Sequence, residues 1–134
     1  AIVANLPHGH GEMVLVVEDE DVVRRAVVEL LEMLRYRTCE AGNGSDALRV
    51  LHEQVGAIDL VVSDAVMPQL GGLGLLQEMR QRGYTMPLIL LTGHPIGVEP
   101  SNLKSQGLSA WLMKPPPLKD LAETIAHVLH HPHR

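Results

Sequence analysis

The chain has 134 residues, a common size for one domain and long enough to bury a hydrophobic core. Hydrophobic residues make up 46% and charged residues 20%, and the net charge is -5, which together exclude a disordered chain and a basic nucleic-acid-binding surface. No apolar run approaches the roughly 20 residues of a membrane helix, and the single cysteine, Cys39, excludes an internal disulfide, so we expect a cytoplasmic domain without membrane contact.

Short apolar runs that are typical of buried strands recur along the chain. The most continuous of them, at 87–91, suits a strand that is buried on both faces. Residues 1–12 mix Gly, Pro and His without a period, and we interpret them as a linker or lead-in to a domain at 13–130, which is followed by a tail at 131–134. The predicted strands occupy residues 14–17, 36–39, 58–62, 87–91 and 110–113.

A helical pattern follows each predicted strand. Ser45 is the predicted N-cap of the second helix, and the last helix begins after three prolines, which are tolerated at a helix entrance but not inside a helix. The pattern is weakest within residues 99–106. Alternating strands and helices with short connections predict an α/β domain, in which one five-stranded parallel sheet has helices on both faces. The predicted helices fall at 23–34, 47–55, 73–79, 99–106 and 118–129.

Polar side chains follow the predicted strands at the place where ligands usually bind a parallel sheet, beyond the carboxyl ends of its strands. Carboxylates that gather at such a place repel one another unless a cation joins them, and oxygen ligands of this kind suit a hard ion such as Mg2+. A hydroxyl and an ammonium group beside that ion could hold an anion. The residues just past the predicted strand ends are Glu18 and Asp19, Glu40, Asp64, Thr92 and Lys114.

Four short motifs in order along the chain resemble the receiver domain of two-component response regulators. Each motif is weak alone, but each falls at a predicted strand end, and the ordered set is specific. The resemblance covers residues 12–129 and implies a flavodoxin-like strand order, 2-1-3-4-5. The motifs are Val17-Glu18-Asp19-Glu20, Val62-Ser63-Asp64-Ala65-Val66-Met67-Pro68 with Gly72, Leu91-Thr92-Gly93, and Met113-Lys114-Pro115.

The resemblance implies a site that accepts a phosphoryl group. Asp64 would take this group from a partner histidine, as the phosphoacceptor of a two-component phosphorelay, and the domain would switch conformation to signal. Mg2+ would be bound directly by Asp19, Asp64 and the backbone carbonyl of Val66, and through water by Glu18. The isolated domain would then be no enzyme beyond its own phosphorylation and dephosphorylation.

The same resemblance assigns the phosphate contacts and the switch. Lys114 would pair with Asp64 and then with a phosphoryl oxygen, while Thr92 would hydrogen-bond another oxygen. The implied positions are Thr92, Lys114, the backbone of Ala65 and Gly93, and Trp111 as the switch residue, with a cis bond before Pro115.

Three features depart from what is usual in this family. Glu18 stands where Asp is more frequent, and Trp111 stands where Tyr or Phe is common. Three prolines at 115–117 follow Lys114, where one is usual, and they should stiffen the approach to the last helix.

Other functions remain open at this point. A degenerate receiver could act only as a scaffold, although such domains usually lack the acceptor Asp, the lysine or the acids that are all present here. An aspartate-nucleophile phosphohydrolase of the haloacid dehalogenase kind would need a second Asp where this chain has Val66. A flavodoxin-like binder would need a phosphate-cradling loop after the first strand, and that stretch is acidic.

The implied partner is a histidine kinase or a histidine phosphotransfer domain. The lead-in and the short end after the last helix resemble the C-terminal receivers of hybrid sensor histidine kinases, so we expect the parent chain to be such a kinase. Family members often pair through a face made by the fourth helix, the fifth strand and the fifth helix, which leaves a homodimer open.

Overall fold

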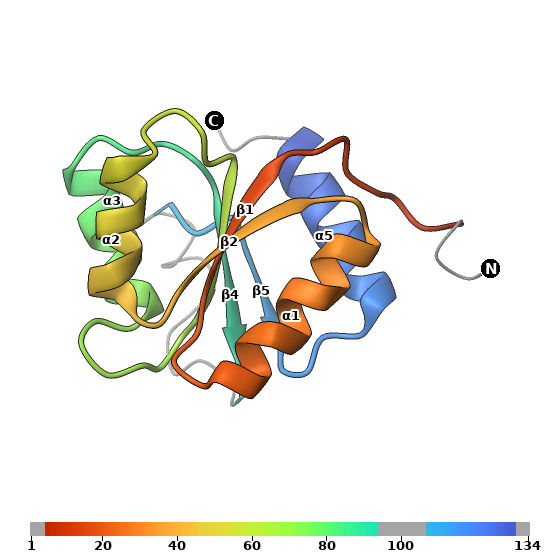
Figure 1. Cartoon of the computed structure of the whole chain (residues 1–134), viewed down its shortest axis with the longest axis horizontal. Helices are drawn as coiled ribbons and strands as arrows, with labels where there is room; N and C mark the ends of the chain where they lie inside the picture. The colour runs from red at the N-terminus through yellow and green to blue at the C-terminus, as the bar shows by residue number, and fades with distance from the viewer. Residues whose placement is uncertain (1–4, 94–106, 131–134) are drawn as a thin grey trace.

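The computed structural model describes residues 5–93 and 107–130 of the chain. Its centre is a five-stranded parallel sheet in the order β2-β1-β3-β4-β5, which confirms the predicted α/β class and strand order (Figure 1). The elements are β1 (Met13–Val17), α1 (Asp21–Met33), β2 (Arg37–Ala41), α2 (Gly44–Glu53), β3 (Leu60–Asp64), α3 (Gly72–Gln81), β4 (Leu88–Thr92), β5 (Ala110–Met113) and α5 (Leu118–His130).

Helices cover both faces of the sheet, as predicted. Figure 1 shows α2 and α3 on one side of the strands and α1 and α5 on the other. Successive side chains of a strand point to opposite faces, so the strands supply two apolar cores. Leu15 and Val61 belong to the core that also holds residues of α2 and α3, whereas Val16 and Val62 belong to the core that holds residues of α1 and α5. Every residue of β3 and β4 is buried, as central parallel strands require.

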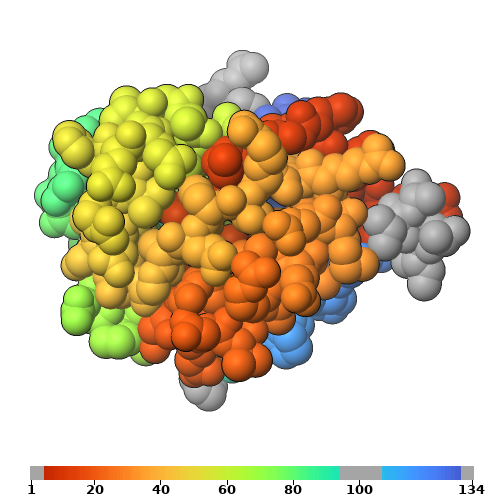
Figure 2. Space-filling model, in the orientation of Figure 1, coloured from red at the N-terminus to blue at the C-terminus, as the bar shows by residue number. Residues whose placement is uncertain are grey.

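The edge strand β2 is more exposed than the central strands. Its first four residues are exposed or partly exposed, and only its last residue, Ala41, is buried. In the space-filling view, the surface of α1 and β2 continues into that of α2 across the visible face (Figure 2). The carboxyl end of β2 leads through two residues into α2, and Glu40 near this end binds Arg24 and Arg25 of α1.

The start of α2 corrects the prediction that Ser45 caps this helix. The N-cap is Asn43, whose side-chain oxygen accepts a hydrogen bond from the amide of Asp46 at 2.8 Å. Ser45 lies in the first turn, and its hydroxyl donates to the carbonyl of Gln69 at 3.3 Å. Asn and Ser cap helices about equally well, so residue type alone does not choose between two such neighbours. Val55, predicted for the apolar face of this helix, lies beyond its end and is 69% exposed.

Three of the strands end one or two residues later than the sequence predicted. β3 continues to Asp64, β4 continues to Thr92, and β2 includes Glu40 and Ala41. Asp64 and Thr92 are therefore the last residues of their strands instead of the first residues of loops. Their backbones are consequently held by the sheet itself.

The segment before β1 packs on the domain. The amide of Gly9 donates to the carbonyl of Leu34 at 2.7 Å, and the amide of Gly11 donates to the carbonyl of Arg35 at 3.2 Å. Gly9 is buried, and a side chain at this position would overlap the ring of Tyr36. Because residues 1–12 show no periodic pattern, the sequence did not predict this packing.

Two expectations fall on residues outside the described ranges. These are the weak helix within 99–106, with the dimer face to which it would contribute, and the tail at 131–134. Among residues 5–93 and 107–130, the structure contains no helix with the length and apolar character needed to cross a membrane.

Candidate functional site

The carboxyl ends of β1, β3, β4 and β5 meet at one edge of the sheet because the strands are parallel. This edge is the lower one in Figure 1, toward which the arrow of β4 points. Within the described part of the chain, the buried polar or charged side chains are those of Glu18, Ser63, Asp64 and Thr92. All four lie at this edge, so the fold gathers its buried polarity in one place.

Three carboxylates form the centre of this site. Glu18, Asp19 and Asp64 each offer an oxygen, and these oxygens lie within 4.8 Å of one another. Glu18 and Asp64 are buried, whereas Asp19 is exposed to solvent. An all-oxygen set of two or three carboxylates fits a hard divalent cation such as Mg2+. The backbone of Val66, the other predicted ligand, follows Asp64 by two residues, and its side chain is 80% exposed.

Lys114 joins two of these carboxylates. Its Nζ lies 3.0 Å from Oε1 of Glu18 and 3.2 Å from Oδ1 of Asp64. Burial opposes the charge of Lys114, but its hydrogen bonds and ion pairs with Glu18 and Asp64 outweigh burial and raise its pKa. Burial also raises the pKa of Glu18, and the nearby acids Asp19 and Asp64 add to this effect, although the hydrogen bonds from the Glu20 amide and from Lys114 oppose it. The ammonium group therefore offsets part of the repulsion among the acids.

Thr92 and Lys114 are fixed relative to each other by the sheet. The amide of Lys114 donates to the carbonyl of Thr92 at 2.8 Å, directly after the pairing of Thr92 with Met113. The side chain of Thr92 is buried at the same edge as Asp64. The peptide bond between Lys114 and Pro115 is cis.

The two backbone positions implied for phosphate contact differ in their surroundings. The amide of Ala65 donates to the carbonyl of Leu91 at 2.9 Å, so this donor is engaged in strand pairing. Gly93 is exposed, and a Cβ at this position would meet no atom within 4 Å. The Ala65 amide is thus already paired, whereas Gly93 lies at the surface.

Glu40 corrects the expectation that it converges with the other acids. It pairs with Val16 across β1 and β2, and directly paired residues point to the same face of a sheet. Val16 faces the core of α1 and α5, so Glu40 points toward the face that α1 covers. Its carboxylate binds Arg24 at 2.9 Å and Arg25 at 3.0 Å instead.

Trp111 lies on β5 opposite Leu90 and is 36% exposed. Met113, two residues further and on the same face, is 43% exposed. The indole is therefore partly in solvent in this structure, and its role as a switch stays a prediction.

Arg24 belongs to the framework of the site and was not predicted from the sequence. Its guanidinium donates to the carbonyl of Glu18 at 2.8 Å, to Glu40 at 2.9 Å and to Asp21 at 2.6 Å. Only the spacing of Asp21 and Arg24, three residues apart on α1, gave any sign of these contacts.

The loop between β3 and α3 is held by the start of α2. Gln69 and Leu70 have positive φ angles of 56° and 93°, and the carbonyl of Leu70 accepts a hydrogen bond from the amide of Gly44 at 3.1 Å. A Cβ on Gly44 would come within 2.5 Å of that carbonyl oxygen. Because this loop carries Val66, the close approach at Gly44 helps to place the predicted carbonyl ligand.

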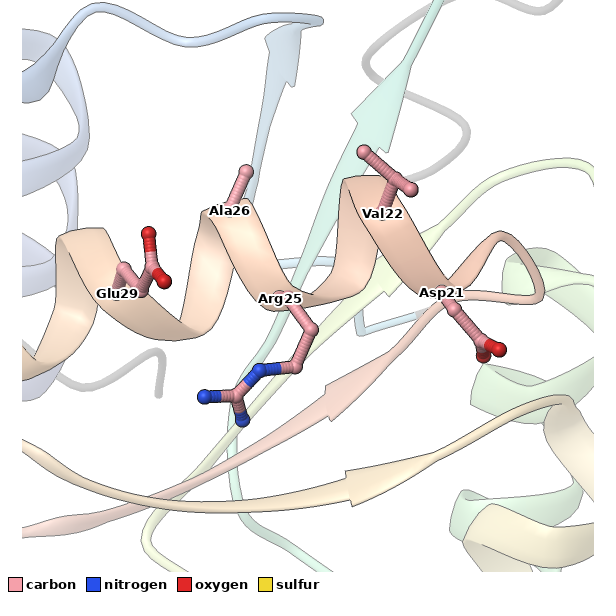
Figure 3. A pocket seen from close by; sticks show the side chains of 5 residues that line it. All are labelled: Asp21, Val22, Arg25, Ala26 and Glu29. Carbon is pink, nitrogen blue, oxygen red and sulfur yellow. The ribbon is translucent and has the colours of Figure 1, made fainter.

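A surface hollow lies on α1. Figure 3 shows Val22 and Ala26 on one side of the helix, and Asp21 and Arg25 on the other. Glu29 completes the lining of the hollow, to which none of Glu18, Asp64 and Lys114 contributes.

Comparison with known proteins agrees with this architecture. Residues 14–126 match the family described as the response regulator receiver domain. The sensor kinase CckA of Brucella abortus is 39% identical over 116 residues, which are 87% of this chain and 12% of that kinase. The chain thus spans about an eighth of the length of that relative.

Solved structures with the same fold include two further similar proteins. A response regulator receiver domain protein from Clostridium thermocellum superposes with a TM-score of 0.81 at 29% identity, over 88% of this chain and 94% of that one. The response regulator TrrA from Thermotoga maritima, solved in complex with Mg(2+)-BeF, superposes with a TM-score of 0.76 at 30% identity, over 88% and 99% of the two chains.

Proposed function

The chain belongs to the family of response regulator receiver domains, and from this premise we propose that it accepts a phosphoryl group on Asp64 and changes conformation to pass on a signal. The observation that carries the proposal is the contact of Lys114 with Asp64, at 3.2 Å, inside a group of three carboxylates. Nucleophile, cation partner and metal-binding oxygens are thus in one place. Phosphoryl transfer depends mainly on positioning and charge neutralisation, and this site supplies both.

In the proposed reaction, a carboxylate oxygen of Asp64 forms a bond to phosphorus. The bond between phosphorus and the nitrogen of a phosphohistidine breaks, and its electron pair stays on the imidazole. The product on Asp64 is an acyl phosphate. The carboxylate is itself the nucleophile, so no general base is needed.

Lys114 and Thr92 are proposed to bind the phosphoryl oxygens. The ammonium of Lys114 already lies between Glu18 and Asp64, so a short movement would bring it to an oxygen on phosphorylated Asp64. Thr92 is buried at the same edge and offers a hydroxyl. The backbone amide of Gly93 would add a further donor, while that of Ala65 would have to leave its bond to Leu91 or share it.

Mg2+ is the proposed cofactor. Glu18, Asp19, Asp64 and the carbonyl of Val66 would hold it, directly or through water, and when bound it would neutralise negative charge that otherwise repels an incoming phosphoryl group. The fit rests on the three carboxylate oxygens within 4.8 Å of one another. Phosphohydrolase chemistry of the haloacid dehalogenase kind has less support, because Val66 stands where that chemistry needs an acid.

The proposed phosphoryl donor is a histidine kinase or a histidine phosphotransfer domain. Support comes from the similarity to the sensor kinase CckA, of which this chain matches only 12%, so a receiver within a hybrid histidine kinase is part of the proposal. As an isolated domain it would turn over only its own acyl phosphate. A cytoplasmic location is also proposed, on the ground of the single cysteine.

The proposal is tested by intact-mass analysis after incubation with acetyl phosphate, with and without Mg2+. We expect one phosphoryl adduct that requires Mg2+ and that the Asp64→Asn variant lacks. Asp59→Asn is the matched control, because Asp59 lies just before the same strand, at the opposite end from Asp64, and binds the amide of Met13. Folded wild-type protein without an adduct under any condition would instead favour a scaffold function.

A further inference from the structure

Arg24 makes three hydrogen bonds to three different segments, and no role in the proposed chemistry explains them. Its Nη1 donates to the backbone carbonyl of Glu18, its Nε to the carboxylate of Glu40 in β2, and its Nη2 to Asp21 in the first turn of α1. The Arg24 side chain is only 17% exposed, whereas that of Asp21 is 84% exposed. A planar guanidinium can donate in several fixed directions at once, which an ammonium group cannot reproduce.

Two hydrogen bonds hold the backbone of Glu18, one at its amide and one at its carbonyl. The amide of Glu18 donates to the carbonyl of Ala41 at 3.1 Å, and the carbonyl of Glu18 accepts from Arg24 at 2.8 Å. The second of these contacts reaches past the end of β1, where the sheet no longer fixes the chain. The loop that carries Glu18 and Asp19 is therefore held by the end of β2 and by Arg24.

The electrostatic setting adds a second reason for this contact. Residues 18–21 are four consecutive acids, and Glu40 brings a fifth acid close to them. Lys114 offsets the charge on the side of Asp64, and Arg24 does so on the side of Asp21 and Glu40. Without Arg24, the loop would gain from opening, because repulsion among its carboxylates would fall.

We infer that Arg24 is a positioning residue, which holds the loop between β1 and α1 in the form that presents the carboxylates of Glu18 and Asp19 beside Asp64. It touches none of the reacting groups and acts through the backbone of Glu18. One of its two tests rests on the proposed Mg2+ site, and the other is independent of it.

The neighbouring Arg25 provides a matched control. It binds the same carboxylate, that of Glu40, at 3.0 Å, but its side chain is 54% exposed and no hydrogen bond joins it to Glu18 among the contacts described. Arg25 points away from Val22 and Ala26 toward β2 (Figure 3). Replacing either arginine removes one positive charge near the same acids. The difference between the Arg24 and Arg25 variants therefore measures the contact of Arg24 with the carbonyl of Glu18.

The first test measures Mg2+ affinity by calorimetry for the wild type and for Arg24→Gln, Arg24→Lys and Arg25→Gln. Loss of a nearby cation should by itself strengthen Mg2+ binding, and Arg25→Gln is expected to bind at least as tightly as the wild type. Loss of the contact between Arg24 and the Glu18 carbonyl should weaken Mg2+ binding, so Arg24→Gln is expected to bind Mg2+ roughly 10-fold more weakly than the wild type. Arg24→Lys keeps the charge but places all its donors on one nitrogen, so it cannot reach the three partners of Nε, Nη1 and Nη2 together and is expected to weaken Mg2+ binding as well.

The second test measures amide hydrogen exchange by NMR on the same variants without metal. In the Arg24 variants, the amides of Glu18 and Glu20 are expected to exchange faster than in the wild type and in Arg25→Gln. The amide of Val62 in the central strand β3 is expected to keep its wild-type rate, which separates an opened loop from a loosened domain. If Arg24→Gln does not fold, Arg24→Lys decides both tests.

The inference is overturned if Arg24→Gln and Arg24→Lys bind Mg2+ as tightly as Arg25→Gln and exchange at wild-type rates. Arg24 would then be a stabilising ion-pair residue only. If the wild type itself binds no Mg2+, the proposed metal site is wrong, and hydrogen exchange alone decides the role of Arg24: faster exchange supports it and unchanged exchange overturns it.

Discussion

The ammonium of Lys114 lies 3.2 Å from the carboxylate of Asp64, although Asp64 ends β3 and Lys114 follows β5, which are not neighbours in the sheet. β4 separates their strands, so the contact depends on all three strands ending at the same level. It brings a positive charge into the cluster of three carboxylates that forms the proposed Mg2+ site.

Replacing Lys114 with Met should therefore lower the stability of the metal-free protein and raise its Mg2+ affinity. Without the ammonium, the three acids repel one another more strongly, and the metal-free protein is expected to lose about 1 kcal/mol of unfolding free energy. The same loss of a competing cation should strengthen Mg2+ binding several-fold, while phosphorylation by acetyl phosphate falls. Urea unfolding and calorimetry would measure the two effects, with Lys119→Met on the exposed side of α5 as the control. Unchanged Mg2+ affinity would mean that Lys114 does not share the site of the ion.

Asn43→Ala is expected to destabilise the protein by about 1 kcal/mol, because it removes the N-cap bond to the amide of Asp46. Ser45→Ala, in the first turn, should cost less than about 0.5 kcal/mol. Urea unfolding of both variants would measure this difference. A larger stability loss in Ser45→Ala than in Asn43→Ala would indicate that Ser45 is the N-cap, as the sequence predicted.

Gly44→Ala is expected to destabilise the protein by roughly 1 to 3 kcal/mol, since the new methyl group would overlap the backbone and side chain of Leu70. Gly42→Ala is the control, because a Cβ at that position meets nothing within 4 Å. The displaced loop carries Val66, so Mg2+ binding should weaken in Gly44→Ala alone. Both variants can be compared by urea unfolding and calorimetry, and equal behaviour would show that the loop adjusts freely.

The stability of the protein should fall at high pH because of Tyr36. Burial, together with the charge of Glu12, raises the pKa of Tyr36 to about 12 in the folded protein, from an ordinary value of 10. The folded state thus favours the neutral phenol, so this contribution is complete below pH 10 and is lost as the pH rises toward 12. The loss amounts to roughly 3 kcal/mol at most.

Lysines also titrate in this range, so the difference between the wild type and Tyr36→Phe isolates the tyrosine. Urea unfolding at intervals from pH 9 to 12 should show the wild type losing stability relative to the variant. A difference that stays constant over this range would mean that Tyr36 ionises as freely as in an unfolded chain.

The sequence predicted the strands to within two residues. β5 occupies the predicted residues and β4 is shifted by one, because a continuous apolar run marks each of them. β3 is displaced by two residues and ends with the polar side chains of Ser63 and Asp64. β2 lies at an edge, is partly polar, and extends two residues beyond the prediction. Polar residues within β2 and β3 therefore concealed where these strands end.

The candidate site was also only partly predictable. Motifs at strand ends named Glu18, Asp64 and Lys114, which the structure brings together. The contacts of Glu40 were not predictable, since its partners Arg24 and Arg25 lie on a different element of the fold. Arg24 was missed for the same reason: one of its partners, Glu40, is 16 residues away along the chain.

The packing of residues 9–12 against the start of β2 has a consequence for how larger assemblies can form. This segment enters at the amino end of β1, about 16 Å along the strand from the carboxylates, and α5 runs back toward the same end (Figure 1). A neighbour joined covalently through either segment would sit at the pole opposite Asp64. A separate protein could then approach the carboxylates while the covalently joined neighbour stays in place, so the two need not compete for space.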